Sequence, residues 1–453
     1  MSQTDIAKNS NKFYIMQIIS KDNKEFWLYS RYGRIGDKGV ISNMPYPYAQ
    51  KWIVIKKFCA VFYSKTGNKW GDVFHNKPGK YVMMNIEEPV LSTDVSQVDL
   101  STNTPNGVVE LVKMISDQTL FTKTLQKLNV DVKRLPLGKI KKEQLDEADE
   151  ILKTIELYLA PGIILQLSSF GHDDPDEFLQ RRLTELSSSF WTLLPYSCGR
   201  NKPPLISTFK ILGECAGTLD DIRGIQISTK VIEYGVTPEK IYRSLDAKIL
   251  EIDRSSTEWG MLLEYVNSSQ GATHGHISLI EAFSIVKNFK DPGTIFKNTT
   301  NHVLLFHGSR SVNFSGILSS GLRIPNNSQI ANGSVLGTGI YFADCVTKSF
   351  NYCHDTTGLV LVCEVALGNE QQLTMASSHP LFPGFHSKKA CGQYAPDPTG
   401  NKKWEKDQSV LVPCGKLKDT IPKYTTGFYY NEYVIYQKEQ YRFRYLLKLK
   451  KNV

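Results

Sequence analysis

The sequence predicts a multidomain α+β protein: a small β-sheet plus helix, then an all-α helical bundle, then a mainly-β domain. A chain of 453 residues exceeds the length at which single cores stop growing, so about three domains are expected. Apolar residues alternate near the amino end, recur at helical spacing in the middle, and form short runs between turns beyond residue 297. The expected parts are a short tail (1–9), the sheet module (10–88), a linker (89–106), the helical bundle (107–229) and the mainly-β domain (230–453).

Strand-like alternation followed by one helix predicts the sheet module. Residues 12–41 alternate as strands do, and a turn at residues 21–24 indicates a hairpin. Residues 48–63 carry apolar side chains at helical spacing and are followed by a glycine-bearing stop, so one helix is expected over the sheet. Trp27 and Trp52 are expected to be core aromatics.

Composition and spacing predict the linker and the bundle. Residues 89–106 contain no Lys or Arg and show little helical periodicity, which is typical of a linker. An apolar helical stripe over residues 145–159 stops at Pro161-Gly162, and Asp174-Pro175 opens a second helix with its own stripe. Such stripes indicate a bundle core and no catalytic role.

Composition and charge narrow the function classes. No apolar run approaches the roughly 18 residues that span a bilayer, and residues 1–8 lack a signal-peptide core, so an intracellular protein without membrane partners is expected. The eight cysteines show neither zinc-site nor C-x-x-C spacing, so no metal and no disulfide framework are expected. Residues 1–88 hold 14 Lys and Arg against 7 Asp and Glu, which is +7 of the chain's +9, and this favours a polyanion partner for the module.

Three short stretches of the last third carry residues able to build a dinucleotide-cleaving pocket: 305–310, 339–344 and 431–433. His307 can donate a hydrogen bond to a ribose hydroxyl, and Ser309 adds a hydroxyl group. Gly308 leaves its backbone N–H and C=O open to a flat carboxamide. Each of these groups supplies something that breaking the nicotinamide–ribose bond of NAD would require.

Aromatic and acidic residues complete this pocket. Tyr341 and Tyr352 offer faces for stacking a nicotinamide ring. Glu432 is the carboxylate that could hold the ribose 2′-OH and stabilise an oxocarbenium-like transition state. Alone, His307 could be a core histidine and Glu432 a capped surface carboxylate, but their joint occurrence with Tyr341 favours the functional interpretation.

The order His307, Tyr341, Glu432 resembles the ADP-ribosyltransferase domain of the poly(ADP-ribose) polymerases, whose signature triad is His, Tyr, Glu. The resemblance covers roughly residues 230–450 and continues through four further motifs: 321–324, 348–354, 364–369 and 445–449. Residues 135–139 and 190–195 resemble segments of the family's helical regulatory domain, which covers the NAD site until DNA binding loosens it.

The resemblance implies roles for individual residues. The implied NAD-binding set is His307, Gly308, Ser309, Asn313, Arg323, Tyr341, Lys348, Ser349, Tyr352 and Asp221. Within it, Gly308 and Ser309 would hold the carboxamide, the two tyrosines would sandwich the ring, and His307 would hold the adenosine ribose. Asn313, Arg323 and Asp221 would frame the adenine end. Glu432, His307 and Tyr341 are the implied catalytic residues, with Lys348 near the pyrophosphate of an acceptor. NAD+ is the implied substrate, and no metal is implied.

The amino-terminal module resembles a WGR domain, the DNA-break-sensing module that accompanies these polymerases. This chain has Tyr32-Gly33-Arg34 where the name-giving triplet is Trp-Gly-Arg. Tyr32 can stack on an exposed base or sugar as Trp does, and Arg34 would contact a phosphate. Asn11 and Tyr81 match further DNA-contacting positions of the family.

The predicted function is a DNA-strand-break-activated ADP-ribosyltransferase that builds poly(ADP-ribose) on proteins, closest to the short family members without zinc fingers. Its expected partners are nicked or broken DNA and acceptor proteins, including the chain itself and histones, and the expected location is the nucleus. One alternative is a mono-ADP-ribosyltransferase, if Ser334 and Val335 leave no acceptor pocket. Another is a non-enzymatic DNA-end-binding protein with a degenerate transferase fold.

Three departures from the family pattern bear on this prediction. Gly333-Ser334-Val335 stands where Gly-Tyr-Met is common, which puts the product length in question. Gly217 replaces a frequent aspartate of the regulatory helix, so the control of the NAD site by the helical domain is expected to be tuned differently. The end at residues 449–453 lacks the Leu-Trp of animal members, so an accessory serine-directing factor that reads this ending is not expected to bind.

Overall fold

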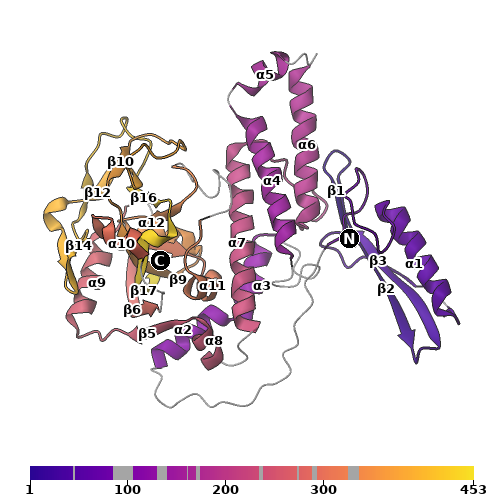
Figure 1. The fold of residues 1–453 in the computed structure, drawn as a ribbon, viewed down its shortest axis with the longest axis horizontal. Helices are drawn as coiled ribbons and strands as arrows, with labels where there is room; N and C mark the ends of the chain where they lie inside the picture. The colour runs from indigo at the N-terminus through magenta and orange to yellow at the C-terminus, as the bar shows by residue number, and fades with distance from the viewer. Residues whose placement is uncertain are drawn as a thin grey trace. The chain divides into compact units, whose positions relative to one another are not determined.

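A computed structural model of the chain describes residues 1–43, 46–84, 106–129, 140–160, 162–169, 174–233, 238–272, 275–287, 293–324 and 336–452. The chain divides into two compact units. Figure 1 labels their helices and strands. The first unit combines Met1–Val90 with Phe121–Leu219, and the second combines Leu91–Leu120 with Asp220–Val453. The predicted motifs at 135–139 and 333–335, and the linker 89–106 up to residue 105, lie outside the described residues.

The first unit begins with an antiparallel sheet in the order β1-β2-β3-β4. Its strands are β1 (Ser2–Asp5), β2 (Ser10–Lys21), β3 (Glu25–Arg34) and β4 (Val40–Asn43). Helix α1 (Lys51–Thr66) packs against β2 and β3 and ends at Gly67, whose backbone is left-handed. The predicted hairpin is confirmed, because Lys21 pairs with Glu25 at its turn.

Residues 1–9, expected to be a tail, instead contain strand β1, which pairs with β2. The strand buries two polar side chains that find partners far along the chain. The Ser2 hydroxyl donates to the Thr192 carbonyl at 2.5 Å, and the Thr4 N–H donates to the Thr192 hydroxyl at 2.9 Å. A local pattern of apolar residues could not reveal this strand, because hydrogen bonds hold it in place.

The core of the sheet module differs from the expectation at both tryptophans. Trp52 is 60% exposed, and Trp27 is only half-buried between Phe26 and Leu28 of β3, whose side chains face the core. The assignment of both as core aromatics was wrong. The buried positions of α1 are instead Val54, Phe58 and Phe62, which follow each other at four-residue spacing and pack on Phe26.

Helices form the rest of the first unit. They are α4 (Lys142–Leu159), α5 (Ile163–Ser169), α6 (Pro175–Leu193) and the first part of α7 (Phe209–Glu233), together with most of α3 (Gln118–Lys127). The two helices predicted from apolar stripes are confirmed as α4 and α6, which pack together. Asp174 caps α6, since its carboxylate accepts a 2.8 Å hydrogen bond from the Glu177 N–H.

Two sheets form the framework of the second unit. The larger has the strand order β13-β14-β7-β9-β17-β6-β5, and the smaller has the order β10-β11-β16-β8. Strands β12 and β15 form a separate two-stranded pair. The larger sheet comprises β5 (Ala247–Glu251), β6 (Ile277–Lys287), β7 (His302–Ser309), β9 (Thr357–Ala366), β13 (Lys402–Trp404), β14 (Asp407–Val412) and β17 (Tyr441–Lys451). The smaller comprises β8 (Ile340–Phe342), β10 (Glu370–Leu373), β11 (Ser387–Ala390) and β16 (Glu432–Ile435), and the pair is β12 (Tyr394–Pro396) with β15 (Leu417–Asp419).

Short helices cover these sheets. They are α2 (Asn106–Ser116), α8 (Pro238–Ser244), α9 (Thr257–Ser268), α10 (Gly293–Asn298), α11 (Phe314–Ser320) and α12 (Val346–Phe350). The mainly-β character predicted for this region is confirmed. None of the helices within the described ranges is long and apolar enough to cross a membrane.

Strand β9 lies at the centre of the second unit, and both of its faces are buried. Leu359, Leu361 and Cys363 belong to one hydrophobic cluster, and Val360 and Val362 belong to another on the opposite face. Because successive side chains of a strand point to opposite faces, a strand buried on both sides is a continuous apolar run. This explains why the sequence shows a run here and no alternation.

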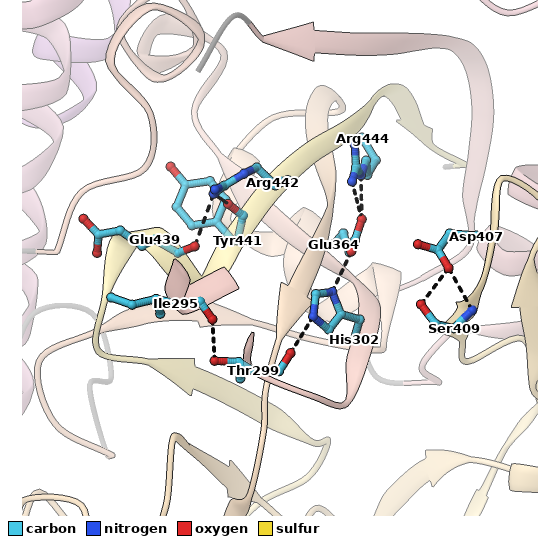
Figure 2. A network of polar contacts seen from close by, with 10 residues as sticks. All are labelled: Ile295, Thr299, His302, Glu364, Asp407, Ser409, Glu439, Tyr441, Arg442 and Arg444. Atoms are coloured by element: carbon cyan, nitrogen blue, oxygen red, sulfur yellow. Dashed lines mark hydrogen bonds and ion pairs between the residues drawn. The ribbon is translucent and has the colours of Figure 1, made fainter. Parts of the chain in front are cut away.

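A polar network interrupts the apolar rows of β7, β9 and β17 (Figure 2). Glu364, which is 3% exposed, accepts from His302 Nδ1 at 2.6 Å and from Arg444 Nε at 2.7 Å. The other ring nitrogen of His302 donates to the Thr299 carbonyl at 2.7 Å. Since both ring nitrogens face acceptors, the protonated imidazolium fits the site, and the hydrogen bond to Glu364 raises the pKa of His302.

This network predicts a pH-dependent contribution to stability. A raised histidine pKa stabilises the fold below the unfolded-state pKa of about 6.5, and the effect is lost as pH rises through the folded pKa. We therefore expect His302→Gln to lower the melting temperature more at pH 6 than at pH 9, as measured by thermal unfolding of the two proteins. The matched control is His379→Gln at an exposed position of the same unit. A melting difference that does not change with pH would contradict this assignment.

Candidate active site

The two sheets of the second unit meet at a backbone bridge. The Phe306 N–H donates to the Ala343 carbonyl at 2.8 Å, and the Ala343 N–H donates back to the Phe306 carbonyl at 3.0 Å. The bridge places the end of β7, with His307, Gly308 and Ser309, next to β8. Strand β16 then pairs with β8 through Val434 and Tyr341. Residues from three distant motifs are thereby brought to neighbouring strands.

His307 is held in one tautomer by the main chain. Its Nδ1 lies 2.8 Å from the Tyr341 carbonyl, which can only accept, so Nδ1 carries the proton. Burial lowers the pKa of His307 and thereby favours the neutral ring, so Nε2 presents a lone pair. This ring can therefore accept a hydrogen bond from a hydroxyl group, where the sequence had suggested that it donates.

Gly308 lies where no side chain fits. A Cβ at this position would approach the Ser349 carbonyl oxygen to 1.8 Å, so the backbones of β7 and α12 are in close contact. The Ser349 hydroxyl, 4% exposed as a residue, donates to the Phe306 carbonyl at 3.2 Å. Ser349 thus fixes the backbone next to Gly308, and its hydroxyl is engaged inside the protein.

The ring of Tyr341 is fixed at its far end. The Tyr341 hydroxyl donates to the Gly337 carbonyl at 2.7 Å and accepts from the Leu336 N–H at 3.1 Å. Because its hydroxyl uses both its donor and an acceptor site, the ring has a defined orientation.

Glu432 forms an ion pair with Lys348 of α12. Both side chains are largely buried, with 12% of the glutamate side chain and 19% of the lysine side chain exposed. Tyr352, in the turn Asn351–Cys353, lies near this carboxylate: burial, with the Glu432 charge adding to it, raises the pKa of Tyr352 to about 12. An acid, a cation and an aromatic ring are therefore gathered at one place.

Asp344 is a functional candidate that the motif reading had not singled out. Its carboxylate accepts from the Asn431 side-chain amide at 2.7 Å and from the Tyr433 hydroxyl at 3.0 Å, so it holds both neighbours of Glu432. Burial raises the pKa of Asp344, which is 1% exposed. The position of Asp344 inside the 339–344 stretch pointed to a role at the site. Its partners Asn431 and Tyr433, however, lie almost 90 residues away in the sequence.

The residues expected at the adenine end lie around helix α7. Asn313 is buried and donates from its amide to the Ser309 hydroxyl at 3.1 Å. A Cβ at Gly224 of α7 would lie 2.4 Å from the Asn313 amide oxygen, so the helix passes close by. Asp221 forms a 2.7 Å ion pair with Arg310, which sequence reasoning had not assigned. Burial raises the pKa of Asp221, and the charge of Arg310 partly offsets this effect.

Arg323 lies three residues beyond the end of α11 and is exposed. Desolvation of the guanidinium lowers the pKa of Arg323, and the nearby charge of Asp220 partly offsets this effect.

The residues expected to contact DNA lie in the first unit, in two different environments. Tyr32 is 40% exposed and stacks on Tyr14, with ring centroids 5.5 Å apart, and Tyr81 packs edge-on against Tyr14. The Lys65 ammonium lies 4.9 Å from the centre of the Tyr14 ring. These residues form an aromatic and basic surface cluster.

Arg34 and Asn11 are engaged inside the first unit. The Arg34 guanidinium donates to the carbonyls of Asn9, Gly199 and Asn201. Asn11 is fully buried, and its amide donates to the Tyr196 carbonyl at 2.8 Å. Both residues thus link the sheet module to the loop that follows α6.

Within the described ranges, no group of three or more His, Cys, Asp or Glu side chains could hold a metal ion. The cysteines there are free thiols, and burial raises the pKa of Cys353, close to Gly358, to about 12. At neutral pH such a thiol is protonated and a poor nucleophile.

Three family models match consecutive parts of the chain. Residues 1–77 match the WGR domain, and residues 102–247 match the regulatory domain of poly(ADP-ribose) polymerase. Residues 256–451 match the catalytic domain of poly(ADP-ribose) polymerase.

Curated relatives match over nearly the whole chain. Poly [ADP-ribose] polymerase 2 of Homo sapiens is 31% identical over 489 residues, which cover 100% of this chain and 79% of that protein. Poly [ADP-ribose] polymerase 1 of Danio rerio is 33% identical over 468 residues, which cover 99% of this chain and 44% of that protein. The chain thus spans less than half the length of the type 1 relative. The domains and the human relative together show that the chain belongs to the poly(ADP-ribose) polymerase family.

Proposed function

We propose that the chain is an NAD+ ADP-ribosyltransferase that builds poly(ADP-ribose) on proteins and is activated by DNA strand breaks. The observation that carries the proposal is the joining of β7, β8 and β16, which brings His307, Tyr341 and Glu432 to neighbouring strands. Membership of the family and the names of the relatives support the same activity.

In this proposal, the residues share the binding of NAD+ between them. The neutral His307 ring accepts a hydrogen bond from a ribose hydroxyl through Nε2. The backbone at Gly308 and the hydroxyl of Ser309 hold the carboxamide, and the rings of Tyr341 and Tyr352 enclose the nicotinamide. Asn313, Arg323 and Asp221 lie toward the adenine, with Asp221 held by Arg310.

The chemical step breaks the bond between the nicotinamide nitrogen and C1′ of the ribose. Nicotinamide leaves with the bonding electron pair, and an acceptor hydroxyl oxygen bonds to C1′. Glu432 holds the ribose 2′-OH, stabilises the positive charge that develops on the ring, and takes up the acceptor proton. Lys348, now paired with Glu432, would move toward the pyrophosphate of an incoming acceptor.

The first unit supplies the proposed response to DNA. Its sheet module carries most of the net positive charge of the chain, and the exposed Tyr32 clusters there with the half-buried Tyr81 and Lys65. Arg34 would exchange carbonyl partners for a phosphate, while the buried Asn11 would support it from within. We therefore propose broken or nicked DNA as a partner, acceptor proteins including the chain itself and histones, and a nuclear location.

Incubation of the purified chain with labelled NAD+, with and without nicked duplex DNA, tests the proposed function. A ladder of labelled products that depends on DNA is expected on a gel. Label in one sharp band would favour the mono-ADP-ribosyltransferase. No label under either condition would favour the DNA-end-binding protein and contradict the proposed activity.

Replacement Glu432→Gln tests the carboxylate. The amide cannot take up a proton and carries no charge, so polymer formation should fall by about 10²- to 10⁴-fold while NAD+ still binds. Labelled-product gels and calorimetric NAD+ titration measure the two properties. The exposed Glu405→Gln is the control and should behave as the wild type. Polymer retained by Glu432→Gln would exclude the role given to this residue.

Replacement Arg34→Ala tests the DNA contact. Because phosphate contacts carry no base information, binding of nicked duplexes should weaken equally for different sequences, and the slope of log affinity against log salt should fall by about one. Fluorescence anisotropy at several salt concentrations measures both effects. Lys24→Ala, in the hairpin turn at the other end of β3, is the control. Unchanged affinity and stimulation in Arg34→Ala would place the contact elsewhere.

A further inference from the structure

A lysine in β11 is buried without a carboxylate partner. Lys388 is 1% exposed, and no acidic side chain of the described residues pairs with it. Burying a charged ammonium is unfavourable unless several strong hydrogen bonds compensate for the lost water. The hydrogen bonds of such a buried lysine can hold backbone segments in place that apolar packing could not hold.

Backbone carbonyls supply the compensation. The Lys388 ammonium donates to the carbonyls of Leu336 at 3.1 Å and Ser377 at 3.0 Å, and also to the carbonyl of His379. The ring of Tyr436 lies under the ammonium, with its centre 5.6 Å away. All three ammonium protons thus meet main-chain oxygens, and these belong to two segments more than 40 residues apart in sequence.

One of these segments is the one that fixes Tyr341. The Leu336 carbonyl accepts from Lys388 and also from the Tyr436 hydroxyl at 2.7 Å, while its N–H donates to the Tyr341 hydroxyl at 3.1 Å. The next residue, Gly337, accepts from the same hydroxyl at 2.7 Å. A Cβ on Gly337 would lie 3.4 Å from the Ser378 carbonyl oxygen, so the two segments lie next to each other.

The strand register places Lys388 and Tyr341 on one face of the smaller sheet. Lys388 lies opposite Val434 of β16, and Val434 lies opposite Tyr341 of β8. Side chains that lie opposite each other on neighbouring strands point to the same face. The ammonium and the Tyr341 ring are therefore two anchors of one segment, at either side of a central strand.

We propose that Lys388 is a positioning residue for the nicotinamide end of the site. Its buried ammonium holds residues 336–337 against 377–379, and through them it sets the place and angle of the Tyr341 ring. This inference rests on the proposed function, in which that ring encloses nicotinamide. Glu432 has other supports, Lys348 and the Asp344 carboxylate, so the loss of Lys388 should affect binding more than the chemical step.

Replacement Lys388→Met keeps an unbranched side chain that is one heavy atom shorter and removes the three donors. We expect the KM for NAD+ and the dissociation constant of nicotinamide, measured by calorimetry, each to rise about tenfold. The kcat should change less than about threefold. The control Lys403→Met lies at an exposed position of β13 and should match the wild type. Lys388→Arg, which keeps the charge and the donors, should recover part of the affinity.

Two further measurements separate positioning from general loss of structure. Hydrogen–deuterium exchange of Lys388→Met should rise at residues 336–337 and 377–379 and remain unchanged along β9. In Lys388→Ala, added n-propylammonium, which has the size of the atoms that the substitution removes, should lower the dissociation constant of nicotinamide again, since its ammonium can reach the same carbonyls. The same addition should have little effect on Lys388→Met, whose side chain fills the space that the stem of the added cation would need.

The outcomes distinguish this inference from the proposed function. Nicotinamide affinity and exchange rates in Lys388→Met equal to those of the wild type would overturn the positioning role alone. A wild-type chain that neither binds nicotinamide nor cleaves NAD+ would overturn the proposed function. Increased exchange at residues 336–337 and 377–379 without loss of nicotinamide affinity would show that the segment is held by Lys388 but does not position the ring, which also overturns the inference.

Discussion

The backbone bridge between Phe306 and Ala343 is the constraint on which the site depends. Two hydrogen bonds join the edge of β7 to the start of the loop after β8, and so join the larger sheet to the smaller one. Every residue type except proline could form these bonds, because they use only main-chain N–H and C=O groups. The side chains that flank them, His307 and Tyr341, are therefore brought together by the fold, and the Tyr341 carbonyl in turn sets the tautomer of His307.

The sequence predicts best what is decided locally. Helix α6 follows from Asp174-Pro175 and the stripe behind it, since a capping side chain and its N–H partner lie three residues apart. Strand β1 could not be predicted, because Ser2 and Thr4 are polar and their partner is Thr192. For the same reason, three short motifs reveal the triad, whereas the sequence does not reveal the roles of Asp344 and Lys388. These two residues contact residues 40 to 90 positions away, and such contacts exist only in the folded chain.

Buried charge is handled in two different ways in the second unit. Glu364 is paired with two cationic side chains, and Lys348 is paired with Glu432. Lys388 is surrounded by carbonyl oxygens, and burial lowers its pKa. A paired ion depends on one partner side chain, whereas an ammonium held by carbonyls depends on the shape of the backbone. The ion pairs join neighbouring strands of a sheet, or join a helix to a strand. The ammonium held by carbonyl groups joins loops that no strand pairing would hold together.

The contact between Gly308 and the Ser349 carbonyl has a consequence for inhibition. With an added Cβ only 1.8 Å from that oxygen, the chain tolerates no other residue there without a shift of the backbone. A compound that binds to the main-chain N–H and C=O of residue 308 would meet groups that no side-chain exchange removes. Resistance to such a compound would have to arise from neighbouring positions that block its entry, and those changes would also hinder a natural ligand of the same shape.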